Sequence, residues 1–145
     1  MLNVKIFAAS GSSLPKKAHD SDACFDLCAG EDASIFPEET KVINTKLIIE
    51  IPEGYCGHVY SRSGLAAKNH IAVLNAPGII DSNYRGEIKI IIHNFDLYST
   101  FRIKKGDRIA QLSILPVEKV SFVEEDEKNL TETERGENGL GSSGI

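Results

Sequence analysis

The chain has 145 residues, of which 41% are hydrophobic and 26% charged, with a formal net charge of −5. A chain of this size can bury one sizeable core, so we expect a single domain. The acidic balance argues against a nucleic-acid surface, because neutralising many phosphates needs clustered Lys and Arg. No apolar run approaches the ~20 residues of a membrane-spanning helix. The first residues also lack the apolar stretch of a signal peptide, so we expect neither membrane insertion nor targeting.

The three cysteines, Cys24, Cys28 and Cys56, are an odd number for a disulfide framework. We therefore expect a reducing, cytoplasmic-type compartment, and a viral or organellar origin is compatible with the sequence. The alternative is a zinc site, because only three residues separate Cys24 from Cys28. Zinc is disfavoured, since no second Cys/His pair at zinc spacing follows and the four histidines are scattered.

In chain order, short segments with alternating or β-branched residues recur between Gly, Pro, Asn and Asp. They cover residues 2–8, 40–44, 46–51, 57–60, 88–94 and 108–114. This pattern predicts an all-β fold, either a sandwich or a barrel, with a jelly-roll-like barrel as one solution that leaves few bare edges. The best helical candidate is a turn or two after Ser63, in Gly-Leu-Ala-Ala-Lys.

The composition changes after Val123, where a run of charged residues begins, and residues 135–145 hold four glycines. This change predicts a folded domain over residues 1–123 and a flexible C-terminal arm over residues 124–145. The plain interpretation of the arm is a frayed terminus. The alternative is an anion cradle, because Arg135 precedes Gly-Leu-Gly-Ser-Ser-Gly, which offers backbone N–H groups and two hydroxyls.

A phosphate is the natural ligand of Arg62, Ser63 and Gly64. They place a guanidinium and a hydroxyl where a helical turn begins and free N–H groups point outward. An ordinary turn is the plain interpretation, because Arg-Ser-Gly is common in turns.

Residues 75–86 predict two strands of one hairpin with its turn around Asp81 to Asn83. The turn brings the Asp81 carboxylate and the Tyr84 ring into one loop. Without further information, Asp81 is a turn former that binds its own backbone, and Tyr84 is part of the core.

Two polar residues interrupt apolar strand patterns. Gln111 follows the turn at Gly106 and Asp107, and Asp26 lies on the face opposite Phe25. Either residue could simply occupy an exposed strand position. The alternative for Asp26 is that its carboxylate binds a hydrated cation.

Together, and in this order and spacing, these segments resemble the five motifs of the homotrimeric dUTPase family. The motifs run over residues 22–27, 62–66, 78–86, 106–111 and 135–144, which span nearly the whole chain. The resemblance implies a distorted jelly-roll barrel in a homotrimer, with each active site assembled from all three chains. It also implies an enzyme that uses Mg²⁺ to split dUTP into dUMP and pyrophosphate. That reaction keeps uracil out of DNA and supplies dUMP for thymidylate synthesis.

The resemblance further implies roles for individual residues. Asp81 is the base that activates the attacking water. Asp26 orients waters on a Mg²⁺ that the triphosphate mainly holds. Tyr84 packs flat against the sugar and excludes a ribose 2′-hydroxyl. The remaining substrate-binding residues are Arg62, Ser63, Gly64 and Gln111 for the phosphates, Asn75, Gly78, Ile79, Ile80 and Lys89 for uracil, and Arg135, Leu140, Gly141, Ser142 and Ser143 in an arm that closes over the γ-phosphate.

The chain departs from the family pattern at two places. Leu140 stands where the family typically has a Phe that stacks on uracil, and such stacking contributes ~1–3 kcal/mol. Leu keeps the apolar contact but lacks the π-face. Asp22 and Cys24 stand where the first motif normally has small residues before its aromatic.

Two other functions compete with this interpretation. A dCTP deaminase shares the fold, but those enzymes are longer, use a glutamate near the position of Asp81, and carry a Ser-Ser pair after the arginine of the second motif. A non-catalytic binding module is the second rival. It is disfavoured because Arg62, Asp81, Tyr84 and Gln111 are all present.

Overall fold

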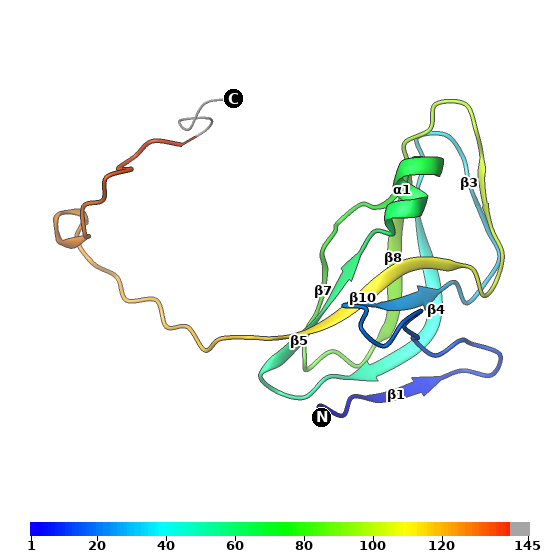
Figure 1. Ribbon diagram of the computed structural model, residues 1–145, viewed down its shortest axis with the longest axis horizontal. Helices are drawn as coiled ribbons and strands as arrows, with labels where there is room; N and C mark the ends of the chain where they lie inside the picture. Colours follow the sequence, from blue (N-terminus) through cyan, green and yellow to red (C-terminus); the bar gives the residue numbers. More distant parts are fainter. Residues whose placement is uncertain (140–145) are drawn as a thin grey trace.

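The computed structural model describes residues 1–139 (Figure 1). Leu140, Gly141, Ser142 and Ser143, which the resemblance assigns to substrate binding, lie outside the described residues. The elements are β1 (Lys5–Ala8), β2 (Phe25–Cys28), β3 (Ala33–Ile35), β4 (Thr40–Glu50), β5 (Tyr55–Tyr60), α1 (Ser63–Asn69), β6 (Ile71–Val73), β7 (Gly78–Ile80), β8 (Glu87–Asn94), β9 (Phe101–Ile103), β10 (Arg108–Pro116) and the 3-10 turn η1 (Glu127–Asn129). The described part is therefore mostly strand with one short α-helix, which confirms the all-β prediction.

Two four-stranded sheets and one two-stranded sheet make up the body. Their strand orders are β1-β4-β8-β6, β2-β10-β5-β7 and β3-β9. The core lies between the two larger sheets. Alternate residues of β8, such as Ile88, Ile90 and Ile92, are 0–2% exposed and meet Leu27 and Leu112 from the other sheet. Each such side chain contributes ~1.5–3 kcal/mol to stability on burial. The sheets are open, so closure into a jelly-roll barrel stays a prediction.

Strand β4 joins two segments that the sequence pattern separates, residues 40–44 and 46–51. Its register with β8 shifts between Asn44 and Ile48, and Lys46 has a left-handed φ of 62°. The interruption of the apolar pattern is therefore a bulge inside one strand rather than a turn between two. The Glu87 carboxylate accepts the Lys46 N–H at 2.7 Å and fastens the bulge to the start of β8.

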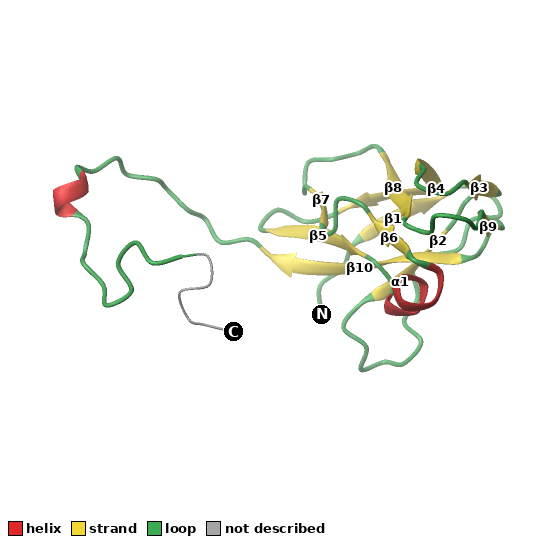
Figure 2. Cartoon of the chain, turned by 90° about the horizontal axis from the view of Figure 1, so that it is seen from above, coloured by secondary structure: helices red, strands yellow, loops and turns green. Residues whose placement is uncertain are grey.

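The predicted hairpin over residues 75–86 is wrong. Strand β7 pairs with β5, whereas β8 pairs with β4 and β6, so the two strands belong to different sheets. The loop between them, residues 81–86, crosses from one sheet to the other (Figure 2). The sequence pattern locates both strands but not their partners, because strand pairing depends on contacts far along the chain.

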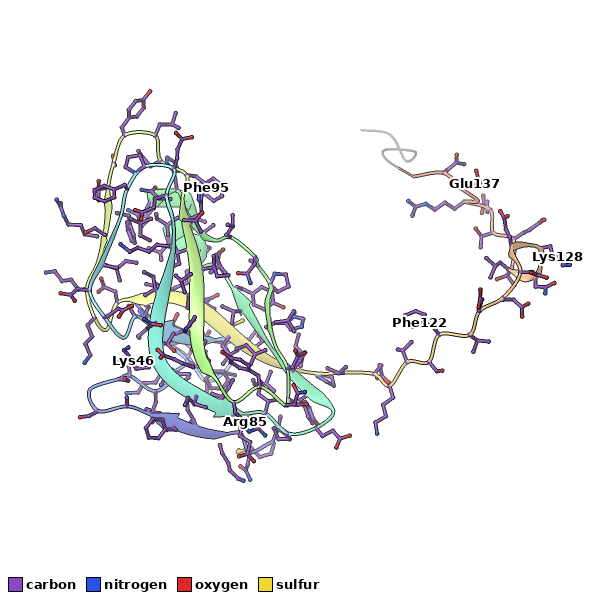
Figure 3. The ribbon with its side chains drawn as sticks, turned by 180° about the vertical axis from the view of Figure 1, so that it is seen from behind. Lys46, Arg85, Phe95, Phe122, Lys128 and Glu137 are labelled. Carbon is purple, nitrogen blue, oxygen red and sulfur yellow. The ribbon has the colours of Figure 1, made fainter. Side chains whose placement is uncertain are left out.

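The body ends shortly after β10. The Val117 N–H donates to the Gly54 carbonyl at 2.8 Å, and from there every residue to position 139 is exposed. Figures 1 and 2 show this segment running away from the body, and Figure 3 shows Phe122 and Lys128 on it. Among residues 1–139, no helix has the length and hydropathy needed to cross a lipid bilayer.

Candidate active site

Three of the predicted phosphate and metal residues meet where β2, β10 and β5 lie side by side. Gln111 is paired with Asp26 on β2 and with Tyr60 on β5, so these three side chains lie in one row on one face of the sheet. Arg62 follows two residues after Tyr60, and helix α1 begins directly after it at Ser63. The sheet register therefore gathers Asp26, Arg62 and Gln111, as the resemblance implies.

Asp26 lies between two arginines. Its Oδ1 is 3.2 Å from Arg62 Nε, its Oδ2 is 3.1 Å from Arg108 Nη1, and Arg62 Nη1 also donates to the Arg108 carbonyl at 2.8 Å. The Asp26 side chain is only 12% exposed. Within the described residues, Oδ1 and Nε are buried without a well-aligned hydrogen bond, so their contact is an ion pair alone. The cluster carries one excess positive charge, which suits an anion.

The donor set near Asp26 fits an ion held mostly by its substrate. Among residues 1–139, no group of three or more His, Cys, Asp or Glu side chains is placed to hold a metal ion. Mg²⁺ commonly keeps several waters and is bound by one or two carboxylates plus phosphates. A single carboxylate beside the predicted phosphate-binding residues meets that requirement, so Asp26 is compatible with the predicted outer-sphere role.

Cys28 lies two residues from Asp26 on β2. Burial raises the pKa of the Cys28 thiol, with the Asp26 carboxylate adding to the rise and a hydrogen bond to Ser13 opposing it. All three cysteines are free. Because the thiolate is the nucleophilic form, a raised pKa disfavours Cys28 as a covalent catalyst.

The predicted uracil and sugar residues line a second region, a pocket between β7 and β8. Its lining includes Asn75, Gly78, Ile79, Ile80, Asp81, Tyr84 and Lys89. Within the described residues, β7 pairs only with β5, and Lys89 and Ile90 of β8 pair only with β4. The facing edges of β7 and β8 therefore leave backbone N–H and C=O groups unpaired at the pocket, available to a ligand.

The loop between β7 and β8 holds the Tyr84 ring in place. The Tyr84 N–H donates to the Asp81 carbonyl at 3.1 Å, and the Tyr84 hydroxyl donates to the Glu87 carbonyl at 3.1 Å. Asp81 itself is exposed, and its carboxylate accepts no hydrogen bond within the described residues. Asp81 therefore does not act as a simple turn former that caps its own backbone, and its carboxylate is free to accept a proton.

The two regions do not meet within one chain. Asp81 follows the Ile80–Gly57 pair, which places it level with Cys56 on β5. Arg62 is six residues further along, roughly 20 Å at ~3.3 Å per residue. The Arg62 guanidinium also turns toward β10 and β2, on the opposite side of β5 from β7.

Two further residues touch the site without having been assigned a role from the sequence. Arg108 belongs to the fourth motif, and a basic residue beside a turn gives no sign that it pairs with Asp26 far along the chain. Glu87 contributes through its carbonyl, for which no sequence signal exists.

The predicted arm residue Arg135 is exposed on the segment beyond the body, where its Nε donates to the Asn138 carbonyl at 2.8 Å.

Known proteins resemble this chain over most of its length. The dUTPase family model matches residues 11–144. The deoxyuridine 5′-triphosphate nucleotidohydrolase of Tropheryma whipplei is 46% identical over 134 residues, which are 92% of this chain and 90% of that protein. The Corynebacterium glutamicum protein of the same name is 48% identical over 131 residues, 90% of this chain and 87% of that protein.

Solved structures give the same result. A variant of the Staphylococcus bacteriophage 80alpha dUTPase with dUpNHpp has a TM-score of 0.85 at 32% identity, with 99% of each chain covered. A variant dUTPase from phage phi11 of S. aureus, described for its coordination of a structural Mg(II) ion, has a TM-score of 0.80 at 27% identity, with 88% of this chain and 99% of that chain covered.

The chain therefore belongs to the dUTPase family. It is an enzyme that hydrolyses deoxyuridine 5′-triphosphate.

Proposed function

We propose that Asp81 activates a water for attack on the α-phosphorus of dUTP, which gives dUMP and pyrophosphate. The observation that carries this proposal is the exposed carboxylate of Asp81, free of protein hydrogen bonds in the described residues, at a pocket lined by the predicted base and sugar residues. A general base must reach the water proton directly, at ~3 Å, and an unpaired carboxylate beside the sugar can do so.

Uracil recognition rests on the unpaired strand edges. Backbone groups of β7 and β8, with Asn75, present donors and acceptors at fixed positions. Cytosine reverses the donor and acceptor at its 3- and 4-positions, so its binding would leave buried backbone groups unsatisfied. Gly78 brings the backbone close, because a Cβ there would lie 3.2 Å from Asn75 Nδ2. Tyr84 forms the wall that faces the sugar and excludes a ribose 2′-hydroxyl.

The phosphate chain is assigned to Arg62, Ser63, Gly64 and Gln111. Asp26 and the Arg108 carbonyl hold the Arg62 guanidinium in position. The guanidinium therefore needs little reorganisation when the substrate phosphates bind. Mg²⁺, when bound, supplies further positive charge against the phosphate oxygens, and Asp26 orients its waters. A relative from phage phi11 is described with a structural Mg(II) ion, which supports Mg²⁺ as the metal of the proposed reaction.

We propose that each active site is shared among the chains of a homotrimer, whose subunits are jelly-roll barrels. A base that activates water beside the α-phosphorus and a guanidinium that binds the same short phosphate chain must lie close together, which a separation of roughly 20 Å within one chain does not permit. The exposed apolar side chains after β10, Val120, Phe122 and Val123, are 69–96% exposed, which supports packing of this segment against another chain.

The C-terminal arm, residues 124–145, is proposed to follow the domain over residues 1–123 and to close as a lid. In this proposal Arg135 binds the γ-phosphate, and Leu140, Gly141, Ser142 and Ser143 cover the bound substrate. Ordering about ten residues costs of order 10 kcal/mol in backbone entropy, so the lid closes only when triphosphate is bound. Three free cysteines support a reducing, cytoplasmic-type compartment, where the reaction would limit uracil in DNA and supply dUMP for thymidylate synthesis.

Hydrolysis in ¹⁸O-labelled water tests the proposed chemistry. Attack on the α-phosphorus places the label in dUMP, whereas attack on the β-phosphorus places it in pyrophosphate. Asp81→Asn should abolish turnover and leave dUTP binding nearly intact, because the shape is kept and the base removed. Asp20→Asn is the control, since Asp20 is an exposed carboxylate outside the site. Label in pyrophosphate, or normal turnover of Asp81→Asn, would contradict the proposal.

A further inference from the structure

The Tyr84 ring rests directly against the Cα of Gly86. A methyl group in place of the Gly86 hydrogen would overlap the Tyr84 hydroxyl oxygen and Cζ, and would lie 2.8 Å from Cε2. Side-chain carbons essentially never approach other atoms this closely in folded proteins. The ring can therefore occupy its position only because residue 86 has no side chain.

Backbone conformation does not explain this glycine. Among residues 1–139, the glycines with a left-handed φ are Gly11, Gly54, Gly106 and Gly136, and Gly86 is not one of them. Gly86 has no left-handed φ that would favour glycine, so the requirement at this position is for space. The three atoms nearest to that space all belong to the Tyr84 side chain.

The same ring is held from two further directions. Its hydroxyl donates to the Glu87 carbonyl at 3.1 Å, and its own N–H donates to the Asp81 carbonyl at 3.1 Å. Tyr84 and Glu87 line the pocket between β7 and β8, whereas Gly86 is not part of that lining. Gly86 therefore lies on the side of the Tyr84 ring away from the pocket, and it determines how far the ring extends into the pocket.

We propose that Gly86 is a specificity-determining residue that selects deoxyribose over ribose by seating Tyr84. The inference rests on the proposed function, in which Tyr84 is the wall against the 2′-hydroxyl. A side chain at position 86 cannot be accommodated by small adjustments, because the overlap extends to the ring carbons. Tyr84 is 43% exposed, so the ring has open solvent to move into. Once displaced, it loses its bond to Glu87 and leaves room for a 2′-hydroxyl.

The test is the ratio of kcat/KM for dUTP to kcat/KM for UTP, measured for both nucleotides on the same sample. This ratio does not depend on the fraction of folded enzyme, so it remains informative if a variant is less stable. Gly86→Ala should lower the ratio by about tenfold or more, the discrimination that one steric contact typically gives. Asn83→Ala is the matched control, because Asn83 is exposed in the same loop and no role is assigned to it.

A double-mutant comparison separates this inference from the proposal on which it depends. If Gly86 acts through the ring, then Gly86→Ala added to Tyr84→Ala changes the ratio no further. An unchanged ratio in Tyr84→Ala would refute the role of Tyr84 itself. A lowered ratio in Tyr84→Ala, with a wild-type ratio in Gly86→Ala, would overturn the role of Gly86 alone. A further loss in the double variant, beyond Tyr84→Ala, would also overturn it.

Discussion

Asp26 and Arg62 form a largely buried ion pair, with 3.2 Å between Oδ1 and Nε, and Arg108 approaches the same carboxylate from another strand at 3.1 Å. The pair joins a residue predicted to orient metal-bound water to one predicted to bind phosphate. Asp26 therefore has a second task, which is to hold two cationic side chains in place when no substrate is present.

Removing Asp26 should reduce the stability of the fold. Asp26→Ala leaves two arginines without their shared partner, a loss of ~1–3 kcal/mol for charged groups deprived of a buried bond. A thermal melt should show a fall of several degrees. Glu50→Ala is the control, because its pair with Lys5 is exposed and such pairs contribute ~0–1 kcal/mol. Equal melting temperatures for the two variants would contradict a structural role for the buried pair.

Base and sugar selectivity follow from the pocket between β7 and β8. Purified protein with Mg²⁺ should release pyrophosphate rapidly from dUTP and only slowly from dCTP, dTTP and UTP. In the proposed function, fixed backbone groups would exclude cytosine, the pocket wall would exclude the thymine methyl group, and Tyr84 would exclude the ribose 2′-hydroxyl. Ammonia released from dCTP would instead indicate a deaminase. Binding of dUTP without turnover would indicate a non-catalytic module.

The arm should matter for turnover and not for folding. Every described residue after Val117 is exposed, and the hydrogen bonds of residues 135–139 are all local to this segment, so deletion from Arg135 onward should leave the body folded. Turnover should fall by orders of magnitude because the γ-phosphate loses Arg135 and water is no longer excluded, while the melting temperature stays within about 1 °C for such a surface change. Loss of folding on truncation would show that the arm is structural.

Leu140 offers a gain-of-function test. Leu140→Phe restores the aromatic that the family typically stacks on uracil, and stacking contributes ~1–3 kcal/mol, which corresponds to about fivefold to over a hundredfold. The KM for dUTP should fall by at least about fivefold, the lower end of that range. Leu140→Ile is the control because it keeps the apolar volume and adds no ring. An unchanged KM in Leu140→Phe would mean that the arm does not approach the base.

Most of the strands and the short helix could be predicted from the sequence, but the pairing between distant strands could not. Alternation predicts the strands that became β1, β5, β8 and β10, and the short helix after Ser63 is confirmed as α1. The pairing of β7 with β5 could not be found this way, because a Gly-Ile-Ile segment has no feature that selects a partner.

The site shows the same division. The predicted pocket residues from Asn75 to Lys89 do line one pocket, and Asp26, Arg62 and Gln111 do lie together. The contact of Arg108 with Asp26 and the seating of Tyr84 on Gly86 depend on side-chain packing between residues whose spacing carries no signal.

The sharing of active sites between chains is the central claim, and mixed oligomers test it most directly. Asp81→Asn and Arg62→Ala should each be inactive alone. Co-expressed in equal amounts, they should recover about a quarter of wild-type turnover, because each part is intact in half of the chains and random assembly combines two chains per site. Native mass spectrometry would confirm that mixed trimers form. No recovered activity in verified mixed trimers would show that each site is built within one chain and would contradict the account.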